Sequence, residues 1–500
     1  MEEHLQKLSN LMAEITDIYH SLALLSWDQQ VYMPTGGASE RGKMMGTLGK
    51  IAHEKFLSEE MGSLLAILKK FLPELDPDSE AYRIIDVTAQ DFEKTVCVPS
   101  SFVVERALIT STAQQAWMEA REKSDYSIFR PHLERLIELN QQFVTFYPTA
   151  DHPYDILLDS FEPGMKTAGV ESIFSSLLPR QVELIKAISQ CPQVDDGFLH
   201  LEYEQKRMWD FSAKVASAFG YDWKRGRQDP TAHPFCQSIG IDDVRITSRW
   251  VRDLPFALLF GTMHETGHAL YDQGIGHTWS RTALEGGTSL GIHESQSRLW
   301  ENIIGRSRPF WEYFFPQLQE VFKTQLGNVS LDQFYRAINK VKPSFIRVEA
   351  DEATYNLHIM LRLELEIGML EGSITARDLP EIWNTKMKDY LGIYPPDDAH
   401  GVLQDIHWSS GMFGYFSTYS LGNIISAQLW EKFKSMDPDI DEQIRQGDFS
   451  SLLSWLRVKI HQYGRKYKPQ ELILRVTKSP IDSEPYMRYL NSKYKDIYAL

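Results

Sequence analysis

The sequence predicts a mostly α-helical protein with one small β element. Along most of the 500 residues, apolar side chains recur every three or four positions, which is the spacing of one helix face. A two-residue alternation typical of a strand occurs in one short stretch, 243–249, where Val244, Ile246 and Ser248 alternate with more polar residues. Clusters of Pro and Gly separate the helical patterns, but none is long enough to act as a linker. We therefore expect a single large helical body, with one domain over 1–500.

A long amphipathic helix opens the chain. Leu8, Leu11 and Ile15 fall on one face of it, and the pattern continues to Leu25 before Pro34 and the glycines after it break the helix. The same spacing predicts helices over 38–56, 59–72, 78–96, 100–122, 126–147, 168–190 and 201–219.

The pattern changes to that of a strand between residues 233 and 250. Val244, Ile246 and Ser248 alternate with polar or charged neighbours there. A lone strand leaves its backbone groups unpaired, so we expect partner strands nearby, around 276–290. Helices are then predicted over 254–273, 291–304, 309–325, 330–340, 349–370, 379–388, 421–434, 440–446 and 450–465.

Composition excludes several classes of protein. With 43% hydrophobic and 24% charged residues the chain is globular and not disordered. Its 52 basic and 68 acidic residues give a net charge of −16, which repels phosphate groups, so we expect no nucleic-acid partner and no membrane partner. The start of the chain shows no secretory signal, and Cys97, Cys191 and Cys236 are far apart, as in a reducing compartment. We expect a cytoplasmic protein.

An HExxH motif lies inside the apolar stretch 255–274, formed by His264, Glu265 and His268. On a helix, positions i and i+4 lie one above the other, so both imidazoles can bind one Zn²⁺. Glu265 lies beside them, where it can take a proton from a metal-bound water whose pKa the metal lowers toward ~7. Burying two unliganded histidines and a glutamate would cost free energy, which favours a metal site over a structural role.

The third ligand is expected on the next helical segment, 291–305. Glu294 opens this segment after a connection long enough for the chain to return antiparallel. Two His and one Glu leave the fourth zinc position open for water, as catalytic sites require. His293 is the competing ligand. Glu301, two turns further on, is expected to be structural or to support the ligands.

Groups that could bind a substrate gather in the segment 401–423. Gln404, His407, Tyr415 and Tyr419 lie there, in a stretch broken by Gly and Ser. A neutral His and a Tyr hydroxyl can both donate to the oxyanion of a tetrahedral intermediate. Packing is the alternative explanation for the aromatic residues.

Two arginines each allow two interpretations. Arg347 lies in an apolar setting just before a helix, and Arg245 lies on the predicted strand. Each could form an ion pair, Arg347 with Asp351 and Arg245 with Asp243. Each could also act as a guanidinium fork for a substrate carboxylate.

Six motifs occur in a fixed order and resemble one family, the Taq-type metallocarboxypeptidases. They are HPF at 233–235, DxRxT at 243–247, HExxH, HES followed by Gln296, IRxxAD at 346–351 and GxxQDxHW at 401–408. The segment MPTGG near the N-terminus is also similar. The resemblance therefore covers nearly the whole chain.

The resemblance implies a mostly helical, saddle-shaped fold with a deep substrate groove, related to neurolysin and angiotensin-converting enzyme. It implies a homodimer with a zinc site that also accepts cobalt. The implied activity is release of single C-terminal residues from peptides with broad specificity, C-terminal proline excepted.

The same resemblance implies a role for each candidate residue. His264, His268 and Glu294 match the metal ligands, and Glu265 matches the general base. His407 and one tyrosine match the groups that bind the oxyanion, with Tyr419 favoured over Tyr415. Arg245 and Arg347 match residues that meet the substrate C-terminus near the closed end of the groove. Tyr415 and Gln404 are also expected to contact substrate.

The sequence therefore predicts a cytoplasmic zinc carboxypeptidase acting on peptides with a free C-terminus. The nearest alternative is an endo-acting oligopeptidase on the same scaffold, which would need no clamp for a carboxylate. The alternative of another class is a non-catalytic peptide-binding protein. The intact HExxH motif argues against the latter, because an inert site would be expected to lose Glu265 first.

Overall fold

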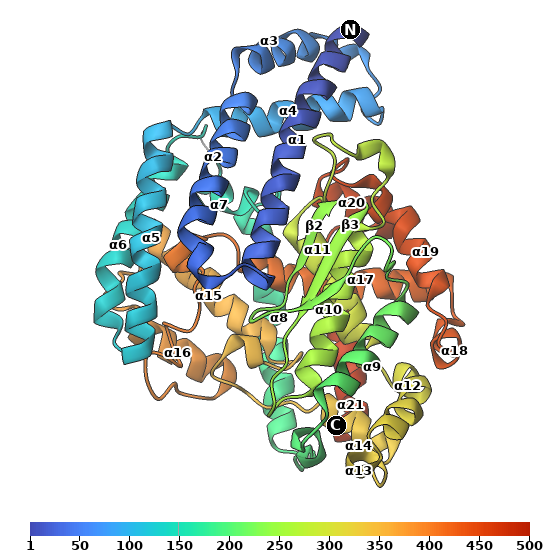
Figure 1. The fold of residues 1–500 in the computed structure, drawn as a ribbon. Coiled ribbons are helices and arrows are strands. Elements are labelled where there is room, and N and C mark those ends of the chain that lie inside the picture. Colours follow the sequence, from blue (N-terminus) through green and yellow to red (C-terminus); the bar gives the residue numbers. More distant parts are fainter. Residues whose placement is uncertain (149) are drawn as a thin grey trace.

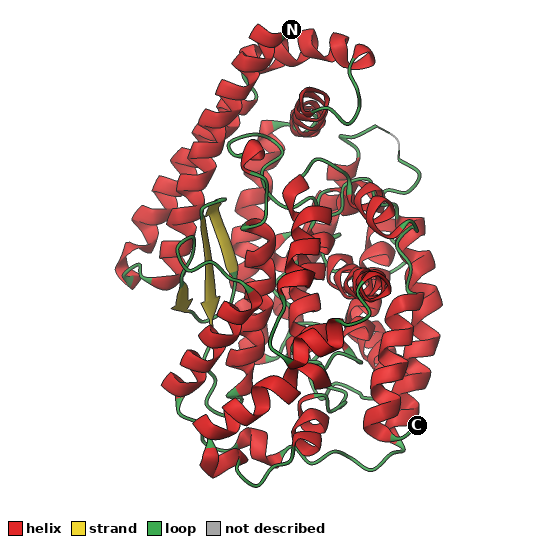
Figure 2. Ribbon diagram, turned by 90° about the vertical axis from the view of Figure 1, so that its right-hand side faces the viewer, coloured by secondary structure: helices red, strands yellow, loops and turns green. Residues whose placement is uncertain are grey.

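The structure is a computed structural model that describes residues 1–148 and 150–500. Helices make up 67% of it, beside one three-stranded sheet, so the predicted mostly α fold is confirmed (Figures 1 and 2). The first half of the chain contains α1 (Glu2–Val31), α2 (Ala38–Phe56), α3 (Glu59–Leu68), α4 (Glu80–Val96), α5 (Ser100–Lys123), α6 (Tyr126–Val144), α7 (Tyr154–Asp159), α8 (Thr167–Ser189), α9 (Gln205–Phe219), β1 (Gln228–Pro230), β2 (Cys236–Gly240) and β3 (Asp243–Ser248).

The second half is helical. It contains α10 (Phe256–Asp272), α11 (Leu290–Arg298), α12 (Arg308–Val321), α13 (Lys323–Leu326), α14 (Leu331–Ile338), α15 (Tyr355–Glu371), α16 (Leu379–Leu391), α17 (Ser417–Met436), α18 (Ile440–Arg445), α19 (Ser450–Lys459), α20 (Pro469–Thr477) and α21 (Glu484–Tyr498). No helix in the described residues is long and apolar enough to cross a membrane.

Most helix boundaries agree with the sequence prediction, and the differences have local causes. The predicted helix 349–370 begins only at Tyr355, because Asp351 accepts hydrogen bonds from the N–H groups of Ala353 and Thr354 and holds a turn there. The predicted helix 291–304 consists of α11 followed by a π-helical segment, Leu299–Ile304. Helices α7, α20 and α21 were not predicted.

The sheet corrects one expectation. β3 forms over Asp243–Ser248 as predicted, but its partners are β1, which is parallel to it, and β2, which is antiparallel. Both partners precede β3 in the chain, so the expectation of partner strands around 276–290 is wrong. A short connection between β2 and β3 allows the preceding segment to pair directly, which costs less chain entropy than closing a longer loop. Val244 and Ile246 of β3 pack with Ala269 of α10.

Helix α11 lies between α10 and α17 at close range. A Cβ atom on Gly267 of α10 would lie 2.6 Å from Ser297 Cα, and one on Gly422 of α17 would lie 2.5 Å from Glu294 Cγ. Glycine at these two positions is therefore required for the three helices to approach each other. This approach brings the HExxH motif on α10 beside Glu294 on α11.

The N-terminal helices form a smaller layer at one end of the molecule (Figure 1). Leu8 and Ile15 of α1 pack with Met61 of α3 and Ile85 of α4 in a core of their own. Helix α1 also passes along β2 (Figure 2). The main core is formed by residues from α5 to α21. Ile84 and Val87 of α4 pack against a separate small cluster that contains Trp279. The N-terminal layer is thus in contact with the rest of the described chain, and one domain over 1–500 stays a prediction.

Candidate metal centre and active site

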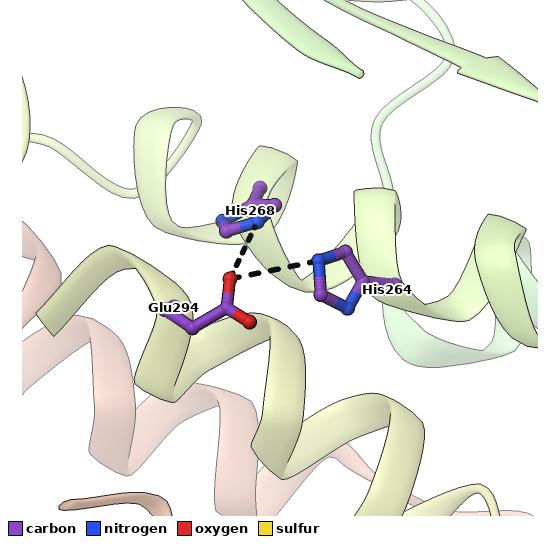
Figure 3. Close-up of side chains that lie close together, drawn as sticks. All are labelled: His264, His268 and Glu294. Atoms are coloured by element: carbon purple, nitrogen blue, oxygen red, sulfur yellow. Dashed lines mark ion pairs between the residues drawn. The ribbon is translucent and has the colours of Figure 1, made fainter. Parts of the chain in front are cut away.

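Three predicted metal ligands lie together at the α10–α11 contact. His264 and His268 come from successive turns of α10, and Glu294 comes from α11 (Figure 3). Glu294 Oε2 lies 3.6 Å from His264 Nε2 and 3.5 Å from His268 Nε2. The three donor atoms lie within 4.8 Å of one another. Two imidazole nitrogens and one carboxylate oxygen are a donor set that zinc accepts in catalytic sites.

The outer nitrogens of both histidines are held by other side chains. His264 Nδ1 lies 2.9 Å from Glu301 Oε2. His268 Nδ1 lies 2.6 Å from His293 Nδ1, and His293 Nε2 lies 3.0 Å from Asp272 Oδ1. These contacts place the Nδ1 hydrogens outward and leave each Nε2 lone pair free to bind a metal. His293 therefore supports His268 and is not part of the donor set, as Glu301 supports His264.

Charges around Glu294 favour its ionised form. Burial alone would raise the pKa of Glu294, but the Arg298 guanidinium and the two histidines hold that pKa well below its usual range. Arg298 Nε donates to Glu294 Oε1 over 2.6 Å. One oxygen of Glu294 is thus fixed by Arg298, while the other faces the histidines. The residues present fit a divalent metal ion.

Glu265 is suited to proton transfer. It lies on α10 beside the ligands, with 6% of its surface exposed. Burial raises the pKa of Glu265 to about 7, with Glu294 and Glu301 adding to the effect and His264 opposing it. A carboxylate with a pKa close to the working pH both accepts and returns a proton readily.

His407, Tyr415 and Tyr419 form an aromatic cluster near these groups. His407 Nε2 lies 3.4 Å from Tyr419 Oη, and the Tyr415 and Tyr419 ring centroids are 5.3 Å apart. Burial lowers the pKa of His407 to about 4, so its ring is neutral at pH 7 and carries one N–H. Burial raises the pKa of both tyrosines, and the Glu294 charge contributes. Tyr419 lies on α17 three residues before Gly422, which packs against Glu294.

Arg347 is almost fully buried, and its partner corrects the sequence prediction. Its Nε and Nη2 groups donate to Asp405 Oδ1 over 3.0 and 2.8 Å, and its Nη1 group donates to Tyr355 Oη over 2.8 Å. The predicted pairing with Asp351 is wrong, because that carboxylate is occupied by the turn that precedes α15. The Asp351 oxygens accept from the backbone N–H groups of Lys342, Ala353 and Thr354.

A second arginine, Arg362, shares the same carboxylate and was missed. Its Nε donates to Asp405 Oδ2 over 2.7 Å, and its side chain is 0% exposed. Burial opposes ionisation of Asp405, but the two guanidinium groups hold its pKa well below the usual range. Two arginines therefore share the Asp405 carboxylate, and the charge of Glu366, on the same helix as Arg362, also interacts with Arg362. An arginine inside the apolar run of α15 was the available signal in the sequence.

Gln404 and Glu366 position this region through hydrogen bonds. Gln404 Oε1 accepts from the Arg347 backbone N–H over 2.8 Å, and its Nε2 donates to Phe345 O over 2.9 Å. Both ends of this amide are therefore engaged by the segment that carries Arg347. Glu366 accepts from Trp408 Nε1 and from the Gly414 N–H, each over 2.8 Å, which holds the loop that carries His407. Glu366 was not predicted.

Arg245 pairs with Asp243 as expected. Its Nε and Nη2 groups donate to the two Asp243 oxygens, each over 2.7 Å, and its guanidinium lies 4.2 Å from the centre of the Trp27 ring on α1. Within the described residues, no hydrogen bond or ion pair joins Arg245 to another predicted site residue.

The chain is similar to known metallocarboxypeptidases over nearly its whole length. A family model described as Carboxypeptidase Taq (M32) metallopeptidase matches residues 7–494. Carboxypeptidase 1 of Bacillus subtilis is 37% identical over 98% of both chains, and Thermostable carboxypeptidase 1 of Thermus thermophilus is 40% identical over 95% of both. The crystal structure of an M32 carboxypeptidase from Deinococcus radiodurans superimposes with a TM-score of 0.97, at 37% identity over 100% of both chains. The chain belongs to the Carboxypeptidase Taq (M32) metallopeptidase family, and it is a peptide-hydrolysing metallocarboxypeptidase.

Proposed function

We propose that this metallocarboxypeptidase uses zinc and releases single amino acids from the free C-terminus of peptides, with broad specificity. One observation carries the proposal. A two-histidine, one-glutamate donor set with the buried Glu265 carboxylate beside it is joined through Arg298 and Tyr355 to Arg347, one of two guanidinium groups that share the Asp405 carboxylate. A substrate with a terminal carboxylate complements both features.

Each side chain then has a defined task. Bound zinc would polarise the scissile carbonyl and lower the pKa of a water. His264, His268 and Glu294 would hold the ion. Glu265 takes the proton of the attacking water and passes it to the leaving amine.

The other groups act on the substrate. His407 and Tyr419 donate to the oxyanion that develops on the carbonyl. Tyr415 packs against both and lines the same surface. Arg347 binds the terminal carboxylate, so that only the last peptide bond reaches the metal. Gln404 holds the Arg347 backbone in place, and Arg245 is proposed to contact the same end of the substrate.

Further properties are inferred from the likeness to the family and from composition. We infer that Co²⁺ can replace Zn²⁺, that the chain forms a homodimer, and that substrates enter a deep groove. A cytoplasmic location is supported by three cysteines, Cys97, Cys191 and Cys236, that form no disulfide among the described residues. The net charge of −16 supports peptide substrates over nucleic acids.

Replacing Arg347 tests its proposed role as the clamp, which is the side chain that binds the terminal carboxylate of the substrate. In Arg347→Lys we expect kcat/KM for a peptide with a free C-terminus to fall by about 10²-fold, because lysine keeps the positive charge but loses the planar fork that binds a carboxylate through two N–H groups. The same peptide with an amidated C-terminus should be affected little, so the preference for the free peptide collapses. Steady-state kinetics on both peptides, with zinc content measured in parallel, gives the result.

A control variant for general destabilisation is Arg252→Lys, because Arg252 is exposed. This variant should match the parent protein on both peptides. An equal loss of activity on free and amidated peptide in Arg347→Lys would contradict the clamp and would favour the endo-acting alternative.

A further inference from the structure

Tyr355 lies between two arginines that serve different parts of the site. It is the first residue of α15 and is 6% exposed. Its hydroxyl accepts a hydrogen bond from Arg347 Nη1 over 2.8 Å. The guanidinium of Arg298 lies over its ring, with Cζ 4.7 Å from the centroid. The tyrosine therefore contacts one arginine through its hydroxyl and the other through its ring.

On the ring side, the contacts lead to the metal ligands. Arg298 Nε donates to Glu294 Oε1 over 2.6 Å. Arg298 Nη1 also donates to Glu301 Oε2 over 3.3 Å, and that same oxygen lies 2.9 Å from His264 Nδ1. Arg298 thus supports two of the three ligands, one directly and one through Glu301.

On the hydroxyl side, the contacts lead to the clamp. Arg347 is held by Asp405, which also binds Arg362. Tyr419, the tyrosine paired with His407, also lies against this group, with its ring centroid 6.1 Å from that of Tyr355 and 4.9 Å from Arg347 Cζ. The contacts Glu294–Arg298–Tyr355–Arg347–Asp405 form an unbroken path. Buried polar contacts of this kind are strong and restrict movement, because the local dielectric is low.

We propose that Tyr355 is a positioning residue that fixes the distance between the metal ligands and Arg347 and so restricts hydrolysis to the last peptide bond. The inference rests on the proposed function, in which Arg347 binds the terminal carboxylate. Each residue advances an extended peptide by only about 3.3–3.6 Å. Selecting one bond therefore requires that the clamp and the metal hold a fixed separation, and a misplacement of about 1 Å is enough to reduce the rate strongly.

Two variants of Tyr355 separate its two contacts. Tyr355→Phe removes the hydroxyl that Arg347 binds and keeps the ring beneath Arg298. We expect KM for a peptide with a free C-terminus to rise about 10-fold, with a smaller change in kcat and unchanged zinc affinity. Mass spectrometry of the products should also show some release of dipeptides. Tyr355→Leu removes both contacts and should in addition weaken zinc binding, measured by competition with a chelator.

Tyr335→Phe is a matched control. Tyr335 is also buried and also lies beneath an arginine, Arg308, at 4.5 Å. This variant should leave KM and the products unchanged. In the Arg347→Lys background, Tyr355→Phe should raise KM no further, because the two changes remove the same contact.

Unchanged KM and purely single-residue products in Tyr355→Phe would overturn the inference, as would a loss confined to kcat and zinc affinity. Either outcome can be distinguished from a failure of the proposed function by the behaviour of Arg347→Lys. If the clamp is right and Tyr355 is not its positioning residue, Arg347→Lys still loses the preference for a free C-terminus. If Arg347→Lys keeps that preference, the proposed clamp itself is wrong.

Discussion

Glu265→Gln is expected to lower kcat/KM by about 10³–10⁴-fold while metal binding remains intact. The glutamine has the same shape and fits a position that is 6% exposed, so the helix and the ligands should be undisturbed. It cannot accept a proton, however, and a positioned general base contributes about 10²–10⁴-fold to the rate of such reactions. The expected loss is at the upper end because the same carboxylate is proposed to protonate the leaving amine.

Steady-state kinetics and zinc analysis of the purified variant would measure both effects. Glu431→Gln is a suitable control, because Glu431 is an exposed residue whose ion-pair partner is Arg488 on the surface. It should have the activity of the parent protein. Normal turnover in Glu265→Gln with one equivalent of zinc bound would show that Glu265 is not the base.

Glu294→Gln is expected to lose zinc and, with it, all activity at stoichiometric metal. The substitution removes the one anionic ligand and leaves Arg298 with Glu301 as its remaining carboxylate partner. Loss of a supporting contact to a ligand typically costs about 10–100-fold in metal affinity, and loss of a ligand should cost more. Chelator competition measures the affinity, and excess zinc should restore part of the activity.

Glu301→Gln provides a graded comparison. Glu301 contacts the outer nitrogen of His264 and is not part of the donor set. Its replacement should weaken zinc binding by about 10–100-fold and no more. If Glu301→Gln lost zinc more completely than Glu294→Gln, the assignment of Glu294 as the third ligand would be wrong.

The metal centre could be predicted because its geometry is local. The i, i+4 spacing of His264 and His268 fixes their relation on any helix, and the structure places both on α10 with Glu294 beside them. The choice between Glu294 and His293 depended on the rotation of α11. In the structure, His293 lies behind His268, where Asp272 binds its other nitrogen.

The clamp could be predicted only in part, because its contacts are distant in the sequence. Arg347 was identified, but Asp351 was named as its partner because it is close in sequence, whereas Asp405 is 58 positions away. Arg362, Glu366 and Tyr355 lie on α15, where their side chains resemble ordinary members of a buried helix. Their roles depend on long-range packing, which helical periodicity does not encode.

A mass-spectrometric time course on a short peptide, free and C-terminally amidated, with and without a chelator, tests the central claim most directly. The proposed function predicts stepwise loss of single residues from the free peptide only, and the chelator should abolish this loss until zinc is restored. Internal fragments from both peptides would contradict the carboxypeptidase mode and would instead indicate an endopeptidase with the same metal centre. No cleavage of either peptide after zinc is supplied would contradict the hydrolytic function altogether.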